Sequence, residues 1–156
     1  MILEPKSIMI SRRELVPLER VRSSLSKVWF IGALILFAVM IAQSIMGHYG
    51  DEPKPAWTWF LGAITPTLTV ILGALSYTAL NPDRLKQVVR IFFYRLALVM
   101  SIIYLILIAL TIAFEPFSSI EPFELMRVSN YWLVPVQSFV VTLISVLFFR
   151  AKPQGT

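Results

Sequence analysis

The chain has 156 residues, of which 57% are apolar and 15% are charged, and its mean hydropathy is +0.75. Soluble domains average about 45–50% apolar and about 25% charged residues, so this composition predicts an integral membrane protein. The single histidine and the absence of cysteine exclude a four-ligand zinc site, an iron–sulfur cluster and a thiol nucleophile built from this chain alone.

Four stretches are long and apolar enough to cross about 30 Å of hydrocarbon as helices. They are residues 28–47, 56–80, 91–114 and 131–149. Only the third contains a charge, Arg95, close enough to its start to reach the membrane surface. Short connections predict an all-α, up-down-up-down bundle of four transmembrane helices over residues 28–149. A basic segment, 1–27, precedes this membrane domain, and a short tail, 150–156, follows it.

Lysine and arginine are unequally distributed among the connections. Twelve of the 14 lie before the first span, in the connection 81–90, at the start of the third span or after the fourth. Only Lys54 and Arg127 lie in the other two connections, which hold five of the nine acidic residues. Because cytoplasmic loops are enriched in Lys and Arg, both termini are expected in the cytoplasm, and the expected location is a bacterial inner membrane. The net charge of +5 is then a topology signal, and no direct binding to nucleic acid is expected.

Two helices are expected to extend beyond the bilayer. Apolar residues at spacings of three and four predict an interfacial helix that begins near Pro17, leads into the first span and turns its basic side chains, Arg22 among them, away from its apolar side. Pro82 is typical of a first helical position, so the third helix is expected to begin there. The basic side chains of the N-terminal segment are expected to bind a cytoplasmic partner or lipid headgroups. These side chains are Arg12, Arg13, Arg20, Arg22 and Lys27.

The second span carries the clearest pattern. Five small residues recur at spacings of 3, 4, 4 and 3, and they are Gly62, Thr65, Thr69, Gly73 and Ser76. This spacing places them on one helical face. In lipid, small residues allow two helices to approach closely, so the face predicts helix packing within or between subunits. Its hydroxyl groups leave a polar pore lining as the alternative.

Pro66 lies near the middle of the same span. Proline removes a backbone donor and leaves the Gly62 carbonyl without its usual partner, which predicts a fixed kink or a gating hinge. Thr65, Thr67 or a neighbouring helix is expected to compensate for the missing bond.

The fourth span has a polar face formed by Ser138, Thr142 and Ser145, with Gln137 adjacent. Gln137 is the most polar side chain deep in any span, so we expect it to form a hydrogen bond between helices. The third span is dominated by large apolar residues and is expected to face lipid. The second and fourth spans are expected to face the protein interior or another subunit.

Catalytic and ion-coupling residues are missing from the middle of every span. No Asp, Glu, Lys or His occurs there, which weakens the case for an ion-coupled carrier. His48 and the carboxylates Glu115, Glu121 and Glu124 lie in connections, where a solvated loop is expected. We therefore expect no enzyme activity, no cofactor and no metal.

Three classes of function remain open. The first is a non-catalytic membrane subunit that anchors or scaffolds a larger complex with cytoplasmic partners. The second is a homo-oligomeric channel or membrane-disrupting effector, as in bacterial defence systems. The third is a small transporter. The expected partners are the lipid bilayer and either further copies of this chain or another protein.

Overall fold

The computed structural model describes residues 15–80 and 88–149. Four of its helices are long and apolar enough to cross a membrane, which indicates an integral membrane protein. The helices are α1 (Leu18–Ile45), α2 (Lys54–Leu80), α3 (Ile91–Phe114) and α4 (Pro122–Phe149). The remaining elements are a 3-10 turn, η3 (Glu115–Phe117), and two short strands, β1 (Leu15–Pro17) and β2 (Val88–Arg90).

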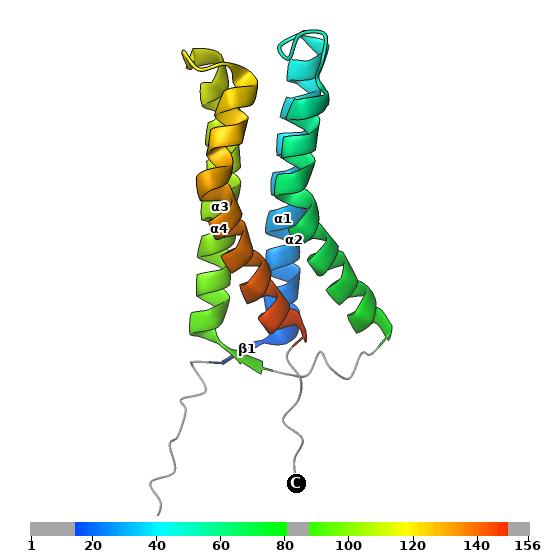
Figure 1. Ribbon diagram of the computed structural model, residues 1–156. Coiled ribbons are helices and arrows are strands. Elements are labelled where there is room, and N and C mark those ends of the chain that lie inside the picture. The colour runs from blue at the N-terminus through cyan, green and yellow to red at the C-terminus, as the bar shows by residue number, and fades with distance from the viewer. Residues whose placement is uncertain (1–14, 81–87, 150–156) are drawn as a thin grey trace, which may run out of the picture.

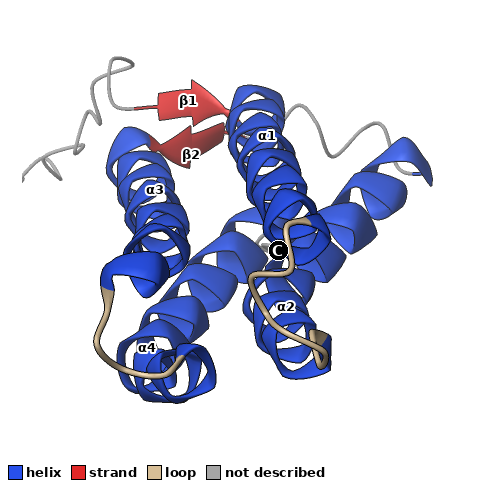
Figure 2. Ribbon diagram, turned by 90° about the horizontal axis from the view of Figure 1, so that it is seen from above, coloured by secondary structure: helices blue, strands red, loops and turns tan. Residues whose placement is uncertain are grey.

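The four helices form a bundle in which α1 and α3 run in one direction and α2 and α4 return (Figure 1). Viewed along the bundle, α1 lies beside α2 and α3, and α4 lies beside the same two helices on the other side (Figure 2). The most extensive packing joins α4 to α2 and to α3. The second half of α2 turns away from α1, so the two helices diverge toward the end of the bundle that carries the strands (Figures 1 and 2).

The helix boundaries agree with the expected ones at the first helix and differ at two other places. The first helix starts directly after Pro17, as predicted, and continues into the first span without a break. Helix α4 begins at Pro122, well before residue 131. The third helix was expected to begin near Pro82 and so to include Val88–Arg90, but these three residues form a strand. Pro82 itself lies outside the described residues.

The two strands pair with each other in antiparallel register, and Val16 lies opposite Val89. β-Branched side chains such as Val88 and Val89 favour extended backbone, and Val89 is buried. The pair joins the chain just before α1 to the chain just before α3. It therefore fixes the starts of these two parallel helices beside each other.

The core is filled by large side chains from all four helices. Trp29, Phe60, Tyr104 and Phe148 are fully buried and come from α1, α2, α3 and α4 respectively. The expectation that the third span faces lipid is therefore wrong for one of its faces. Helix α3 also buries Ser101 and packs against both α1 and α4. Its opposite face carries exposed apolar residues, which are Ile102, Ile103, Ile106 and Leu110.

The strand register predicts a cross-link. The variant Val16→Cys/Val89→Cys should form an intramolecular disulfide, because directly opposite residues have Cα atoms about 4.5–5.5 Å apart and a disulfide tolerates about 4.4–6.8 Å. The chain has no natural cysteine, so oxidation followed by non-reducing electrophoresis of a chain cleaved between the two sites gives a clean readout. The matched pair Val16→Cys/Val88→Cys should cross-link poorly, because neighbouring strand residues point to opposite faces. Equal yields from the two pairs would contradict the register.

Candidate functional site

The middle of the bundle contains a hydrogen-bonded junction built around Pro66. Proline has no N–H, so the carbonyl of Gly62 lacks the bond that α2 would normally supply. The side chain of Gln137 in α4 donates to this carbonyl at 3.0 Å and to the Ala63 carbonyl at 2.8 Å. A neighbouring helix, rather than Thr65 or Thr67, therefore supplies the missing donor. The sequence pointed to the polarity of Gln137, and the structure identifies its acceptors.

Tyr104 completes this junction from α3. Its hydroxyl donates to the Ala63 carbonyl at 2.9 Å, and its ring lies 5.9 Å from the ring of Trp29 in α1, measured between centroids. All four helices therefore meet within one set of contacts. The sequence patterns did not point to Tyr104, although a tyrosine deep in a span is a signal, because a buried phenol usually finds a hydrogen-bond partner.

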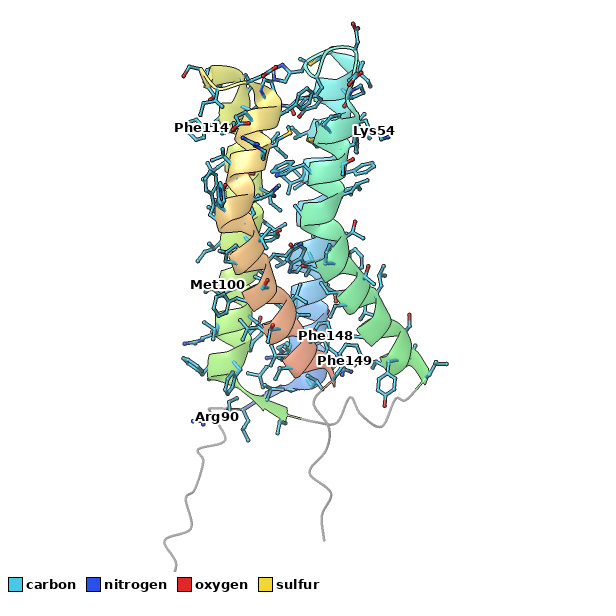
Figure 3. The ribbon with its side chains drawn as sticks, viewed as in Figure 1. Lys54, Arg90, Met100, Phe114, Phe148 and Phe149 are labelled. Atoms are coloured by element: carbon cyan, nitrogen blue, oxygen red, sulfur yellow. The ribbon has the colours of Figure 1, made fainter. Side chains whose placement is uncertain are left out.

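A second junction lies where α1 begins and α2 and α4 end. Arg22 is only 3% exposed, which corrects the expectation that it faces away from the apolar side of its helix. Its guanidinium donates to the Thr78 hydroxyl and to the Phe148 carbonyl, and it lies over the Phe148 ring at 5.6 Å. Figure 3 shows Phe148 at the end of α4, beside the first turns of α1.

Arg22 suits this position for a physical reason. The last carbonyls of a helix have no partner within the helix, and they carry partial negative charge. The Arg22 guanidinium supplies both a donor and a positive charge at the end of α4. Its bond to Thr78 holds the end of α2 in the same junction. Helical spacing is the signal that separates Arg22 from the exposed Arg20 and Lys27, because Arg22 follows Leu18 by four residues and precedes Leu25 by three on the buried side of α1.

The other predicted docking residues fall into two groups. Arg20 and Lys27 are exposed on α1, where they remain available to a partner or to lipid headgroups. Arg12 and Arg13 lie outside the described residues.

The small-residue face of α2 points away from the bundle core. All five of its members, Gly62, Thr65, Thr69, Gly73 and Ser76, are exposed. A Cβ atom added at Gly62 or Gly73 would meet no neighbour within 4 Å. Of the five, Gly62 contacts another helix through its carbonyl, which accepts from Gln137 of α4, and the exposure of all five favours packing between subunits over packing within this chain.

The polar face of α4 also points outward. Ser138 and Thr142 are exposed and Ser145 is half-buried. The Ser138 hydroxyl donates to the Val134 carbonyl at 2.9 Å, and the Thr142 hydroxyl donates to the Ser138 carbonyl at 2.8 Å. These bonds within the helix satisfy the hydroxyl protons without a second helix. Thr69, Gly73 and Ser76 follow Pro66 at the same intervals at which Ser138, Thr142 and Ser145 follow Pro135, a correspondence visible in the sequence alone.

The opposite end of the bundle is joined by a contact between a histidine and a glutamate. Glu115 is 5% exposed and pairs with His48, which corrects the expectation of a solvated carboxylate and an isolated histidine. Tyr49 is buried beside them and donates to the Gln43 side chain at 2.5 Å. Burial, followed by the negative charge of Glu115, raises the pKa of Tyr49 to about 12, so this phenol stays protonated at neutral pH. The pair links the α1–α2 loop to η3.

The polar side chains described above form hydrogen bonds with one another and with backbone carbonyls of other helices. Within residues 15–80 and 88–149, no group of three or more His, Asp or Glu side chains is placed to hold a metal ion. Comparison with protein family models, with curated proteins and with solved structures finds no match.

Replacing Arg22 with Met should lower the free energy of unfolding by about 1.5–3 kcal/mol, the usual effect of losing hydrogen bonds from a charged group. Methionine keeps much of the side-chain volume but donates to neither Thr78 nor Phe148. Thermal unfolding in a mild detergent measures the change. The control Arg20→Met alters an exposed residue on the same helix and should change stability by less than about 0.5 kcal/mol. Equal losses in the two variants would show that Arg22 does not hold the helix ends together.

A double-mutant cycle tests the junction at Pro66. Gln137→Leu should cost about 0.6–1.7 kcal/mol of stability, in the range measured for hydrogen bonds between membrane helices. In a Pro66→Ala background the cost should be smaller, because the substituted alanine would provide an N–H for the Gly62 carbonyl. Ser138→Ala serves as a control, since this exposed hydroxyl bonds only within its own helix. An identical cost of Gln137→Leu in both backgrounds would refute the compensation.

Proposed function

We propose that this protein is a non-catalytic subunit of a larger membrane complex, which it joins through the outer face of α2 and α4. The observation that carries this proposal is the exposure of the five small residues of α2, together with the empty space around Gly62 and Gly73. In lipid, such a face brings two helix backbones close together and gains packing energy that large side chains prevent.

The remaining outer surface contrasts with this face. Helices α1 and α3 present large apolar side chains, which suit contact with lipid chains. Examples are Ile31, Leu34 and Ile35 on α1 and Val99, Ile103 and Ile106 on α3. The outer faces of α2 and α4 also carry exposed large residues such as Leu72 and Phe139, so the small and hydroxylated residues make up part of this surface. That part is where a second helix could approach closely.

The proposed orientation places both termini in the cytoplasm, most simply across a bacterial inner membrane. The strands, the start of α1 and the exposed Arg20 and Lys27 lie at one end of the bundle, together with Arg90 and Arg95. The excess of Lys and Arg at this end supports a cytoplasmic location. A cytoplasmic protein would then find a basic surface beside the membrane, and its own chemistry would provide the activity of the complex.

Gly73→Leu should disrupt assembly, because the added side chain occupies the space that a second helix needs. An overpacked contact costs about 1–3 kcal/mol, so association should weaken by about tenfold or more. Native mass spectrometry of the full chain, extracted gently from its own membranes, measures the stoichiometry. The control Ala38→Leu adds the same side chain at an exposed position on α1 and should leave the assembly intact. A purely monomeric wild-type chain, or equal assembly of the two variants, would overturn the proposal.

A homo-oligomeric channel or membrane-disrupting effector is the second candidate. It is favoured by the outward hydroxyl groups of Thr65, Thr69 and Ser76 and by those of Ser138 and Thr142, which would line a polar path between copies. In liposomes containing the purified chain, Thr69→Leu should then reduce ion flux by about tenfold while leaving the oligomer unchanged. No flux from an intact homo-oligomer, or equal flux from the variant, would contradict this candidate. A small transporter ranks third, since no acidic or basic residue lies in the middle of a span.

A further inference from the structure

The divergence of α1 and α2 leaves a pocket at the end of the bundle that carries the strands. Its volume is about 420 Å³, and its walls are formed by the first turns of α1 and the last turns of α2. Pro66 explains the opening, because a proline within a helix bends it and here turns the second half of α2 aside (Figure 1). We call this space the α1/α2 pocket.

The polar wall of the α1/α2 pocket combines two positive charges with hydroxyl groups. Arg22 and Lys27 line it, as do Ser23 and Ser26. Ser26 is only 7% exposed, and its hydroxyl has no hydrogen-bond partner in the described part of the chain. A buried hydroxyl without a partner is costly in an apolar environment, so this donor indicates a ligand that accepts a hydrogen bond.

The charges at the pocket suit an anion. The Arg22 guanidinium is held in place by Thr78 and by the Phe148 carbonyl, so its positive charge is fixed at the wall of the pocket. Lys27 is exposed at the rim, where its ammonium group is free to turn toward a ligand. Glu19 also lines the pocket, which leaves one net positive charge among these three residues. A singly charged phosphate diester matches this balance better than a fully ionised phosphate.

The rest of the pocket is apolar. Phe30, Ile31 and Leu75 line its other side. Lys27 and Ile31 also line a groove of about 440 Å³ between α1 and α3, whose remaining wall is made almost entirely of apolar side chains such as Ile35, Ile102 and Ile106. A phosphate site beside apolar grooves in a transmembrane bundle fits a lipid, because the grooves can hold acyl chains. A free phosphate ion would make no use of the apolar surfaces.

We propose that the α1/α2 pocket binds the headgroup of an anionic phospholipid. Its phosphate accepts hydrogen bonds from Ser26 and Lys27, and the charge of Arg22 stabilises it from the wall. The acyl chains lie along Phe30, Ile31 and the groove between α1 and α3. The bound lipid would fill the gap between α1 and α2 and satisfy the Ser26 hydroxyl. This proposal depends on the pocket alone and stands whether or not the α2/α4 face assembles.

Native mass spectrometry of the full chain in detergent tests the site, with phosphatidylglycerol as the probe and phosphatidylcholine of the same acyl chains as the comparison. Phosphatidylglycerol should bind at least about tenfold more tightly, since choline would bring a positive charge toward Arg22 and Lys27. Ser26→Ala and Lys27→Gln should each weaken phosphatidylglycerol binding by about tenfold, as expected for loss of one hydrogen bond to a charged group. Ser23→Ala, at an exposed lining position, provides a further variant with little risk to folding and should weaken binding about threefold.

The control variant is Arg20→Gln, which removes an exposed charge from the same helix outside the pocket. It should change the affinity by less than about twofold, because an exposed charge is largely screened by salt. If it weakens binding as much as Lys27→Gln does, attraction by the basic surface explains the result and the site is refuted. If inorganic phosphate in excess displaces the lipid, the pocket is a free anion site and the lipid assignment is wrong. Equal affinity for the two lipids would also overturn the proposal.

Discussion

The bundle depends on the high cost of leaving a backbone carbonyl without a donor in an apolar environment. Pro66 creates such a carbonyl at Gly62, and Gln137 of α4 supplies the donor. The same glutamine and Tyr104 of α3 both donate to the neighbouring Ala63 carbonyl. The defect in one helix is thereby repaired by two others, which ties three helices together at one depth of the membrane. Ridges of apolar side chains alone would fix the relative heights of these helices less strictly.

The bend at Pro66 shapes the end of the bundle that carries the strands. It turns the second half of α2 away from α1, which opens the α1/α2 pocket beside the buried Arg22. Arg22 then holds the ends of α2 and α4 near the start of α1 through Thr78 and Phe148. At the other end of the bundle, His48 and Glu115 join the two helical hairpins. The polar contacts thus lie at three depths, and each joins elements that are distant in sequence.

The distribution of side-chain size around the bundle separates two environments. Large residues fill the core and cover the outer faces of α1 and α3, whereas the outer faces of α2 and α4 combine small and hydroxylated residues with exposed large ones such as Leu72 and Phe139. Hydroxyl groups such as those of Ser138 and Thr142 bond to their own helix, so they do not require a partner to be stable in lipid. Exposure of glycine is different, because Gly62 and Gly73 bring backbone to the surface and offer a neighbouring helix close approach. The glycines are therefore the stronger sign of an assembly face.

Four helices long and apolar enough to span a membrane, and their approximate positions, can be predicted from the amino-acid sequence alone. Hydropathy over about 20 residues reports this directly, because the thickness of the bilayer sets the length of a span. The sequence also identified Pro66, Gln137 and the spacing of the small residues, since each depends only on local chemistry and helical periodicity. Tertiary structure decided which face of each helix is buried. Lipid chains are as apolar as a protein core, so hydrophobic patterning does not distinguish inside from outside in a membrane bundle.

For the same reason the sequence could not assign the partners of its polar residues. Arg22 and Arg20 are chemically identical and two positions apart, yet only the packing of α2 and α4 against α1 buries the first. The strand pair between Val16 and Val89 depends on a contact between segments separated by two complete spans. Only the folded bundle also shows that the small residues of α2 face outward, because their spacing defines a face without giving its direction.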